Sequence, residues 1–82
     1  MNFNLLIKFA DGTEKAVSAN PVDVVAFESN FNLSVAKLQS EIRMTHIFWL
    51  GWHVEKRTKA TNLEFEAWLD LITMVELVPP KK

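Results

Sequence analysis

Residues 40–57 read SEIRMTHIFWLGWHVEKR, and the fold depends on this stretch. On a helix, with about 100° per residue, its apolar side chains cover an arc of about 200°, roughly twice the stripe of an ordinary surface helix. We therefore expect a central helix, from near Ser40-Glu41 to about Arg57, that is covered on more than one side. Gly51 predicts close packing, since glycine inside a helix costs about 1 kcal/mol relative to alanine. The residues of the arc are Met44, Ile47, Phe48, Leu50, Gly51, Trp52 and Val54.

Trp49 lies outside this arc, on the polar side of the predicted helix. Two interpretations are open. Another element, such as the last helix, covers the ring, or Trp49 stays partly exposed as an anchor for a protein partner, a role in which tryptophan is enriched. The candidate protein-binding residues are Trp49, Trp52, Phe48 and Lys56.

Residues 3–19 are typical of a β-hairpin. Apolar and polar residues alternate along residues 3–9, Asp11-Gly12 indicates a tight turn, and residues 13–19 return as a second strand. Two strands alone are marginally stable in water, so the hairpin must pack on helices or gain a third strand.

Charge selects the register of this hairpin. A two-residue loop would set Lys8 opposite Lys15, and like charges in that position are destabilising. A three-residue loop with Gly12 in a left-handed conformation instead pairs Lys8 with Glu14 and Leu5 with Val17. We expect the second register.

Asn20-Pro21-Val22-Asp23 predicts a helix start, with a capping side chain, proline in the first turn and an acidic residue. Val24, Phe27 and Phe31 share one stripe of this helix, which should end near Asn30. Asn32 to Ser34 should break it, and residues 35–39 should form a short helical turn.

Thr61 and Glu64 have capping-box spacing and predict a last helix. It should place Phe65, Trp68, Leu69 and Ile72 on one side and Glu66, Asp70 and Thr73 on the other. Residues 75–78 are an extension of that helix or a strand.

The predicted fold class is α+β, with an N-terminal two-stranded β-hairpin followed by three to four α-helices around the tryptophan-rich central helix. We expect one domain over residues 1–78 and a short Pro/Lys tail over residues 79–82.

Composition excludes several classes of function. The 82-residue chain has no cysteine, so disulfides and thiolate metal sites are excluded. Nine basic residues against ten acidic ones argue against nucleic-acid binding. The longest apolar run, residues 47–52, is far too short for a membrane span. The N-terminus lacks signal-peptide features, and we expect a cytoplasmic protein.

No catalytic, cofactor or metal site is expected. His46 and His53 are seven residues apart, and a helix rises about 10.5 Å over that distance, so they cannot share one metal ion. We expect both to be solvated on the polar face. No nucleophile motif or phosphate-binding loop is present. Lys56, Arg57 and Lys59 should interact with the carboxyl end of the central helix, or alternatively with an acidic patch on a partner.

The order of segments resembles that of a known family. The segments are FADGTEK (residues 9–15), PVDVVAFE (21–28), FWLGWHVEKR (48–57) and LEFEAWL (63–69). Across nearly the whole chain this layout resembles the small tail-assembly chaperones of long-tailed (siphovirus-type) bacteriophages. The resemblance implies a non-enzymatic protein in the cytoplasm of the host cell. Such a protein binds the tape measure protein, keeps its hydrophobic segments soluble and helps recruit tail tube subunits.

The resemblance carries over no individual functional residue. Self-association into a homo-oligomer is compatible with so small a fold. Two other functions remain as alternatives: a virion structural protein, such as a head-tail connector or tube-associated protein, and a small regulatory protein that binds a host protein.

Overall fold

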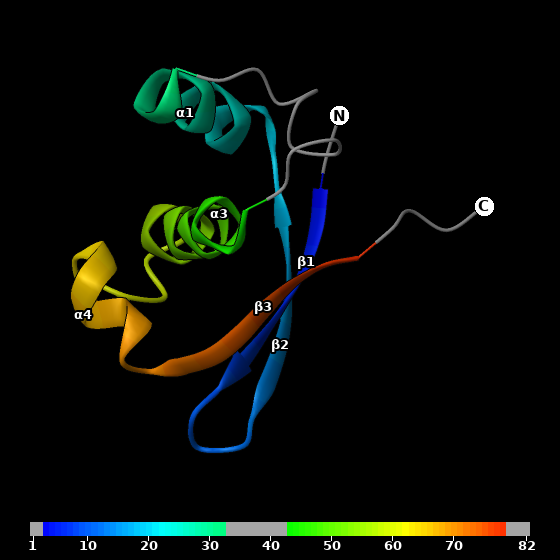
Figure 1. The fold of residues 1–82 in the computed structure, drawn as a ribbon, viewed down its shortest axis with the longest axis vertical. Coiled ribbons are helices and arrows are strands. Elements are labelled where there is room, and N and C mark those ends of the chain that lie inside the picture. The colour runs from blue at the N-terminus through cyan, green and yellow to red at the C-terminus, as the bar shows by residue number, and fades with distance from the viewer. Residues whose placement is uncertain (1–2, 33–42, 79–82) are drawn as a thin grey trace.

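A three-stranded antiparallel sheet carries all the described helices on one of its faces (Figure 1). The computed structural model describes residues 3–32 and 43–78. The strand order is β2-β1-β3, so β1 is central. The mixed α+β class is confirmed, with one strand more than the predicted hairpin. The elements are β1 (Phe3–Phe9), β2 (Glu14–Ala19), α1 (Pro21–Phe31), α3 (Met44–Arg57), α4 (Phe65–Leu69) and β3 (Ile72–Val78).

The hairpin of β1 and β2 has the predicted register. Leu5 lies opposite Val17 and Lys8 opposite Glu14. Gly12 has a φ of 96°, a conformation that glycine adopts without steric cost. Turn chemistry and cross-strand charge, both local in sequence, were therefore sufficient to select this register.

The third strand replaces the end of the predicted last helix. The sequence predicts that this helix continues through Ile72 and Thr73, but α4 ends at Leu69 and both residues belong to β3. Residues 72–78 are rich in strand-forming side chains, and the second edge of β1 offers them backbone hydrogen bonds. The helical stripe and the strand pattern overlap at Ile72, and pairing with β1 decides between them.

The predicted capping box of α4 is also wrong. Glu64 is itself the N-cap residue, and its side chain makes no capping hydrogen bond. The Oγ1 atom of Thr61 instead accepts a hydrogen bond from the backbone N–H of Leu63, at 3.2 Å, in the preceding loop.

Helix α1 begins as predicted. The Oδ1 atom of Asn20 accepts hydrogen bonds from the N–H groups of Val22 and Asp23, and the Asp23 carboxylate accepts one from the N–H of Asn20. The helix ends at Phe31, one residue beyond the prediction, and Asn32 caps it with a φ of 51°. The helical turn predicted at residues 35–39 lies outside the described residues.

Helix α3 ends at Arg57 as predicted but begins later than predicted. Arg43 has an extended backbone, with φ of −120° and ψ of 146°, so the helix begins at Met44. The predicted start at Ser40-Glu41 lies outside the described residues. Among the described helices, none has the length and apolar character needed to cross a membrane.

The core lies between the sheet and α3, with α1 and α4 on either side of that helix (Figure 1). The wide apolar arc is covered as expected, except at Met44, which is 44% exposed. A Cβ atom on Gly51 would lie 3.3 Å from Val75 Cγ1 and 3.4 Å from the ring of Trp68, which confirms the predicted close packing. The buried hydrophobic residues of the described part of the chain are Leu5, Ile7, Ala19, Phe27, Ile47, Leu50, Val54, Trp68 and Val75.

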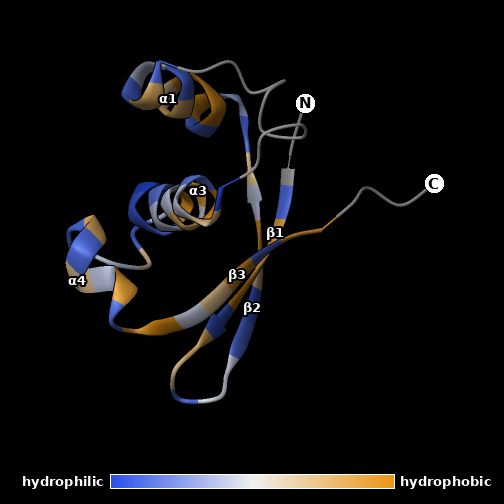
Figure 2. Ribbon diagram, viewed as in Figure 1, coloured by the Kyte–Doolittle hydropathy of each residue, from blue (hydrophilic) through white to orange (hydrophobic). Residues whose placement is uncertain are grey.

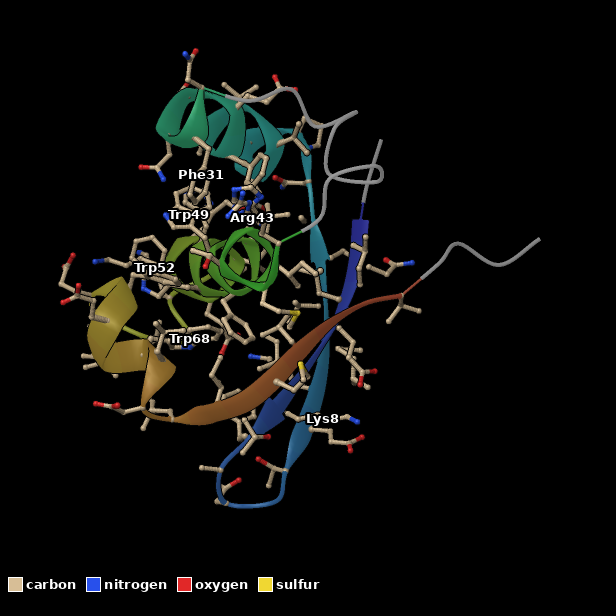
Figure 3. The ribbon with its side chains drawn as sticks, in the orientation of Figure 1. Lys8, Phe31, Arg43, Trp49, Trp52 and Trp68 are labelled. Carbon is tan, nitrogen blue, oxygen red and sulfur yellow. The ribbon has the colours of Figure 1, made fainter. Side chains whose placement is uncertain are left out.

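The other face of the sheet carries no described helix, and Lys8 lies on that side in Figure 3. Two polar pairs cross it. The Nζ atom of Lys8 lies 3.2 Å from Glu76 Oε2 on β3, and Ser18 Oγ donates to Asn4 Oδ1 at 2.8 Å. Met74, opposite Lys8, and Val78, opposite Asn4, are exposed apolar side chains on the same face, so this face is mixed in character.

Candidate functional site

Four half-buried aromatic rings form a continuous row across the three described helices. Phe31 comes from α1, Trp49 and Trp52 from α3, and Phe65 from α4. The ring centroids are 5.6 Å apart for Phe31 and Trp49, 5.8 Å for Trp49 and Trp52, and 5.8 Å for Trp52 and Phe65. We call these four residues the aromatic seam. Figure 3 shows Phe31, Trp49 and Trp52 on the side of the helices away from the sheet.

Helix geometry places the two tryptophans in the seam. They are three residues apart on α3 and lie on neighbouring parts of its surface. The indole N–H of Trp52 donates to the carbonyl of Leu63 at 2.9 Å, which ties α3 to the loop before α4. Among the described residues, the indole N–H of Trp49 has no hydrogen-bond partner. Trp49 therefore carries a donor that is unpaired within the described part of the chain.

The candidate binding residues do not all meet in one place. Trp49 and Trp52 are in contact, and Lys56 Nζ lies 5.5 Å from the centre of the Trp52 ring. Lys56 also pairs with Glu64 Oε2 at 3.0 Å. Phe48 is half-buried against the core and, within the described part of the chain, makes no ring contact with either tryptophan.

Helix α1, not the last helix, covers the polar side of α3. The ring of Trp49 meets Phe27 and Phe31 of α1 edge-on, with centroids 6.3 and 5.6 Å apart. Trp49 is nevertheless only half-buried, so α1 covers the ring in part and leaves part of the side chain exposed.

A buried charged centre joins α1 to α3. Asp23 is fully buried, and Arg57 Nε lies 3.0 and 3.1 Å from its two carboxylate oxygens. The Nδ1 atom of His53 lies 2.5 Å from Asp23 Oδ1, and the backbone N–H of Asn20 donates to Oδ2 at 2.9 Å. Burial alone raises the pKa of Asp23, but the hydrogen bonds from Arg57, Asn20 and His53 outweigh it and hold the pKa below its usual value.

Both histidines were predicted to be solvated, and this is wrong. His53 is engaged by Asp23, and its ring stacks on Trp49 with centroids 5.0 Å apart and planes 17° apart. His46 meets Phe31 edge-on at 4.7 Å, and its Nδ1 atom is buried with no hydrogen-bond partner among the described residues. Both histidines are covered because α1 packs over this side of α3. The pattern of apolar and polar residues within α3 does not indicate which other helix packs on it.

Lys56 and Arg57 lie in the last turn of α3, as predicted. In addition, Arg57 binds Asp23 and Lys56 pairs with Glu64. Lys59 follows the helix in a left-handed conformation, with a φ of 65°. The sequence features that could have indicated the charged centre are Asp23 in the first turn of α1 and His53 and Arg57, four residues apart on α3.

The contacts of the charged centre join α1 to α3. An aspartate bound to a histidine Nδ1 orients the ring in many catalytic sites, but Asp23 here is also neutralised by Arg57 and caps α1. Within the described part of the chain, no hydroxyl group hydrogen-bonds to His53, and no cluster of metal-ligating side chains occurs.

A second buried carboxylate is held similarly. Glu55 of α3 is 4% exposed, and its Oε2 atom lies 2.8 Å from Lys15 Nζ of β2. This pair links the helix layer to one edge strand of the sheet.

No protein-family model matches the chain, and no curated protein or solved structure is significantly similar to it.

Proposed function

We propose that this chain is a non-enzymatic protein-binding domain that acts as a tail-assembly chaperone. In this role it binds a hydrophobic segment of the tape measure protein and aids assembly of the tail tube. The resemblance in segment order suggests the biological role, and the aromatic seam suggests the surface that performs it.

The aromatic seam is the observation that carries this proposal. Its four rings are in contact and only partly buried, so they are already ordered before a partner arrives. Ordered aromatic side chains lose little conformational entropy on binding and offer large apolar area, which is why they anchor protein interfaces. Leu63, whose carbonyl accepts the hydrogen bond from the Trp52 indole, is also an exposed apolar side chain.

The charged residues near the seam also favour binding over catalysis. The buried carboxylates of Asp23 and Glu55 are paired with Arg57 and Lys15, so they serve the fold. A general acid or base would instead have to face a substrate.

The seam suits an amphipathic helix or another apolar segment of the partner. Such a segment can lay its apolar side chains across the rings, as in helix-in-groove recognition. The indole N–H of Trp49 offers one hydrogen bond to a carbonyl of that segment.

A charge placed beside the seam tests the proposal without removing any ring. Thr45 is exposed, lies one turn before Trp49, and belongs to the first turn of α3, which has no acidic residue. Thr45→Glu should therefore stabilise the helix by about 0.3–1 kcal/mol while setting a carboxylate beside the rings. Val25→Glu is the matched control. It places the same charge on an exposed site of α1 about 120° around that helix from Phe31.

Co-purification with tape measure protein is the measurement. We expect the wild-type chain and Val25→Glu to retain the tape measure protein in a soluble complex, and Thr45→Glu to lose at least nine-tenths of it. Equal retention by all three would exclude the seam as the binding surface. No complex with the wild-type chain, together with a stoichiometric amount in purified particles, would support a virion structural protein instead.

A further inference from the structure

The two edge strands of the sheet differ in how they are protected. Strand β2 carries Lys15, whose side chain is directed to the helix face, where it binds Glu55 at 2.8 Å. An inward-directed charge of this kind is a common device against extension of a sheet edge. Strand β2 is therefore a poor site for a further strand.

Strand β3 has no comparable protection. Its sequence ITMVELV contains one charged residue, Glu76, and Lys8 already pairs with it on the open face of the sheet. The ribbon of β3 is coloured as mostly hydrophobic (Figure 2). Among the described elements, only β1 pairs with β3, so its outer edge is free.

The hydrogen bonds of β1 show which groups of β3 face outward. The N–H of Phe9 donates to the carbonyl of Thr13, so the backbone groups of Phe9 face β2. The carbonyl of the preceding residue, Lys8, accepts from Thr73 Oγ1 and so faces β3. Because this direction alternates along a strand, the backbone groups of Met74, Glu76 and Val78 face β1. Those of Val75 and Leu77 face outward.

We propose that β3 pairs antiparallel with β3 of a second copy of this chain, about a two-fold axis at Val75. The two three-stranded sheets then join into one continuous sheet of six strands. The outward N–H and C=O groups of Val75 exchange hydrogen bonds with the same groups of the second copy.

Charge and overlap favour this register. With the axis at Val75, all seven residues of β3 find a partner, and Glu76 lies opposite Met74 of the second copy. Moving the axis to Glu76 would set two glutamates directly opposite each other, which is destabilising. The strand is thus complementary to itself in the Val75-centred register.

Sedimentation of two Met74 variants tests this pairing. Met74 is 37% exposed and lies opposite Lys8 within the chain. Met74→Glu adds an attraction to Lys8 but a repulsion toward Glu76 of the second copy, whereas Met74→Lys does the reverse. We expect the dimer dissociation constant to rise about tenfold in Met74→Glu and to fall in Met74→Lys. Their thermal stabilities as monomers should change in the opposite order, which separates pairing from folding.

Amide hydrogen exchange locates the contact. The N–H groups of Val75 and Leu77 should become protected as the protein concentration rises. By the same alternation, Ala16 and Ser18 have outward N–H groups on β2, and these should exchange freely at every concentration.

Several results would overturn the proposal. These are a monomer at every concentration reached, protection at Ala16 and Ser18 in place of Val75 and Leu77, or equal dimerisation of the two Met74 variants. Thr45→Glu should dimerise like the wild type, because the aromatic seam lies on the helices. Loss of the dimer in that variant would also contradict pairing through β3, whatever its effect on partner binding.

Discussion

His53 and Asp23 lie 30 positions apart in the chain, yet the Nδ1 atom of His53 is 2.5 Å from Asp23 Oδ1. The same carboxylate binds Arg57 and caps the first turn of α1. One buried side chain thereby starts a helix and fixes that helix against α3. His53 also stacks on Trp49, so the charged centre is in direct contact with the aromatic seam.

Asp23→Ala should be among the most destabilising single substitutions in the chain. It leaves Arg57 and His53 without their buried partner and removes an acceptor of the capping box. Breaking a buried ion pair on one side costs about 3–5 kcal/mol, a large part of the stability of a domain this small. Urea denaturation measures the loss. Glu66→Gln, at an exposed site on α4, should change stability by less than about 0.5 kcal/mol.

The free energy of unfolding should decrease as the pH is lowered, over a pH range set by the pKa of Asp23. Its folded-state pKa is lowered, so its contribution is complete above the unfolded pKa of about 3.9 and is lost as pH falls through the folded value. Urea midpoints measured from pH 6 downward should therefore decline below about pH 4. Hydrogen bonds from Thr13 also lower the pKa of Asp11, so the comparison is made in an Asp11→Asn background. If Asp23→Asn in that background shows the same decline, the assignment to Asp23 is wrong.

Gly51→Ala should destabilise the domain despite its better helix propensity. The added Cβ atom would lie 3.3 Å from Val75 Cγ1 and 3.4 Å from Trp68, and both neighbours are fully packed. Overpacking costs about 1–3 kcal/mol against a helix gain of about 1 kcal/mol, so we expect a net loss of about 1 kcal/mol. Thermal denaturation checks the sign. A higher melting temperature would mean that Val75 and Trp68 move aside at little cost.

Trp49→Ala should reduce stability as well as partner binding. The ring packs on Phe27, Phe31, Trp52 and His53, and half-burial suggests a loss of about 2–3 kcal/mol, below that of a fully buried tryptophan. Circular dichroism during urea denaturation measures this loss. An unchanged midpoint would show that the ring contacts α1 without stabilising it, and would leave Trp49 with a binding role alone.

The parts of the fold that were predictable depend on residues close together in sequence. Asp11-Gly12 and the charges of Lys8 and Glu14 select the hairpin register, and Asn20 with Pro21 starts α1. The end of the last helix was not predictable in this way. Ile72 suits a helical stripe and a strand equally well, and only the free edge of β1 decides between them.

The candidate site was predicted in part. Trp49 was identified as lying outside the apolar arc, and Trp52 was named as a candidate binding residue within it, because both positions on α3 follow from helix geometry. Their neighbours Phe31 and Phe65 come from other helices, and no periodicity within α3 specifies which helix covers it. The charged centre was missed for the same reason, since Asp23 and Arg57 belong to different helices.

Local backbone and side-chain preferences were sufficient to predict the α+β class, the hairpin, the start of α1, the wide apolar arc of α3 and the close packing at Gly51. The third strand, the burial of Asp23 with His53 and the aromatic seam required contacts between segments that are far apart in the chain. These features depend on which distant surfaces meet, and packing of the whole chain settles that choice.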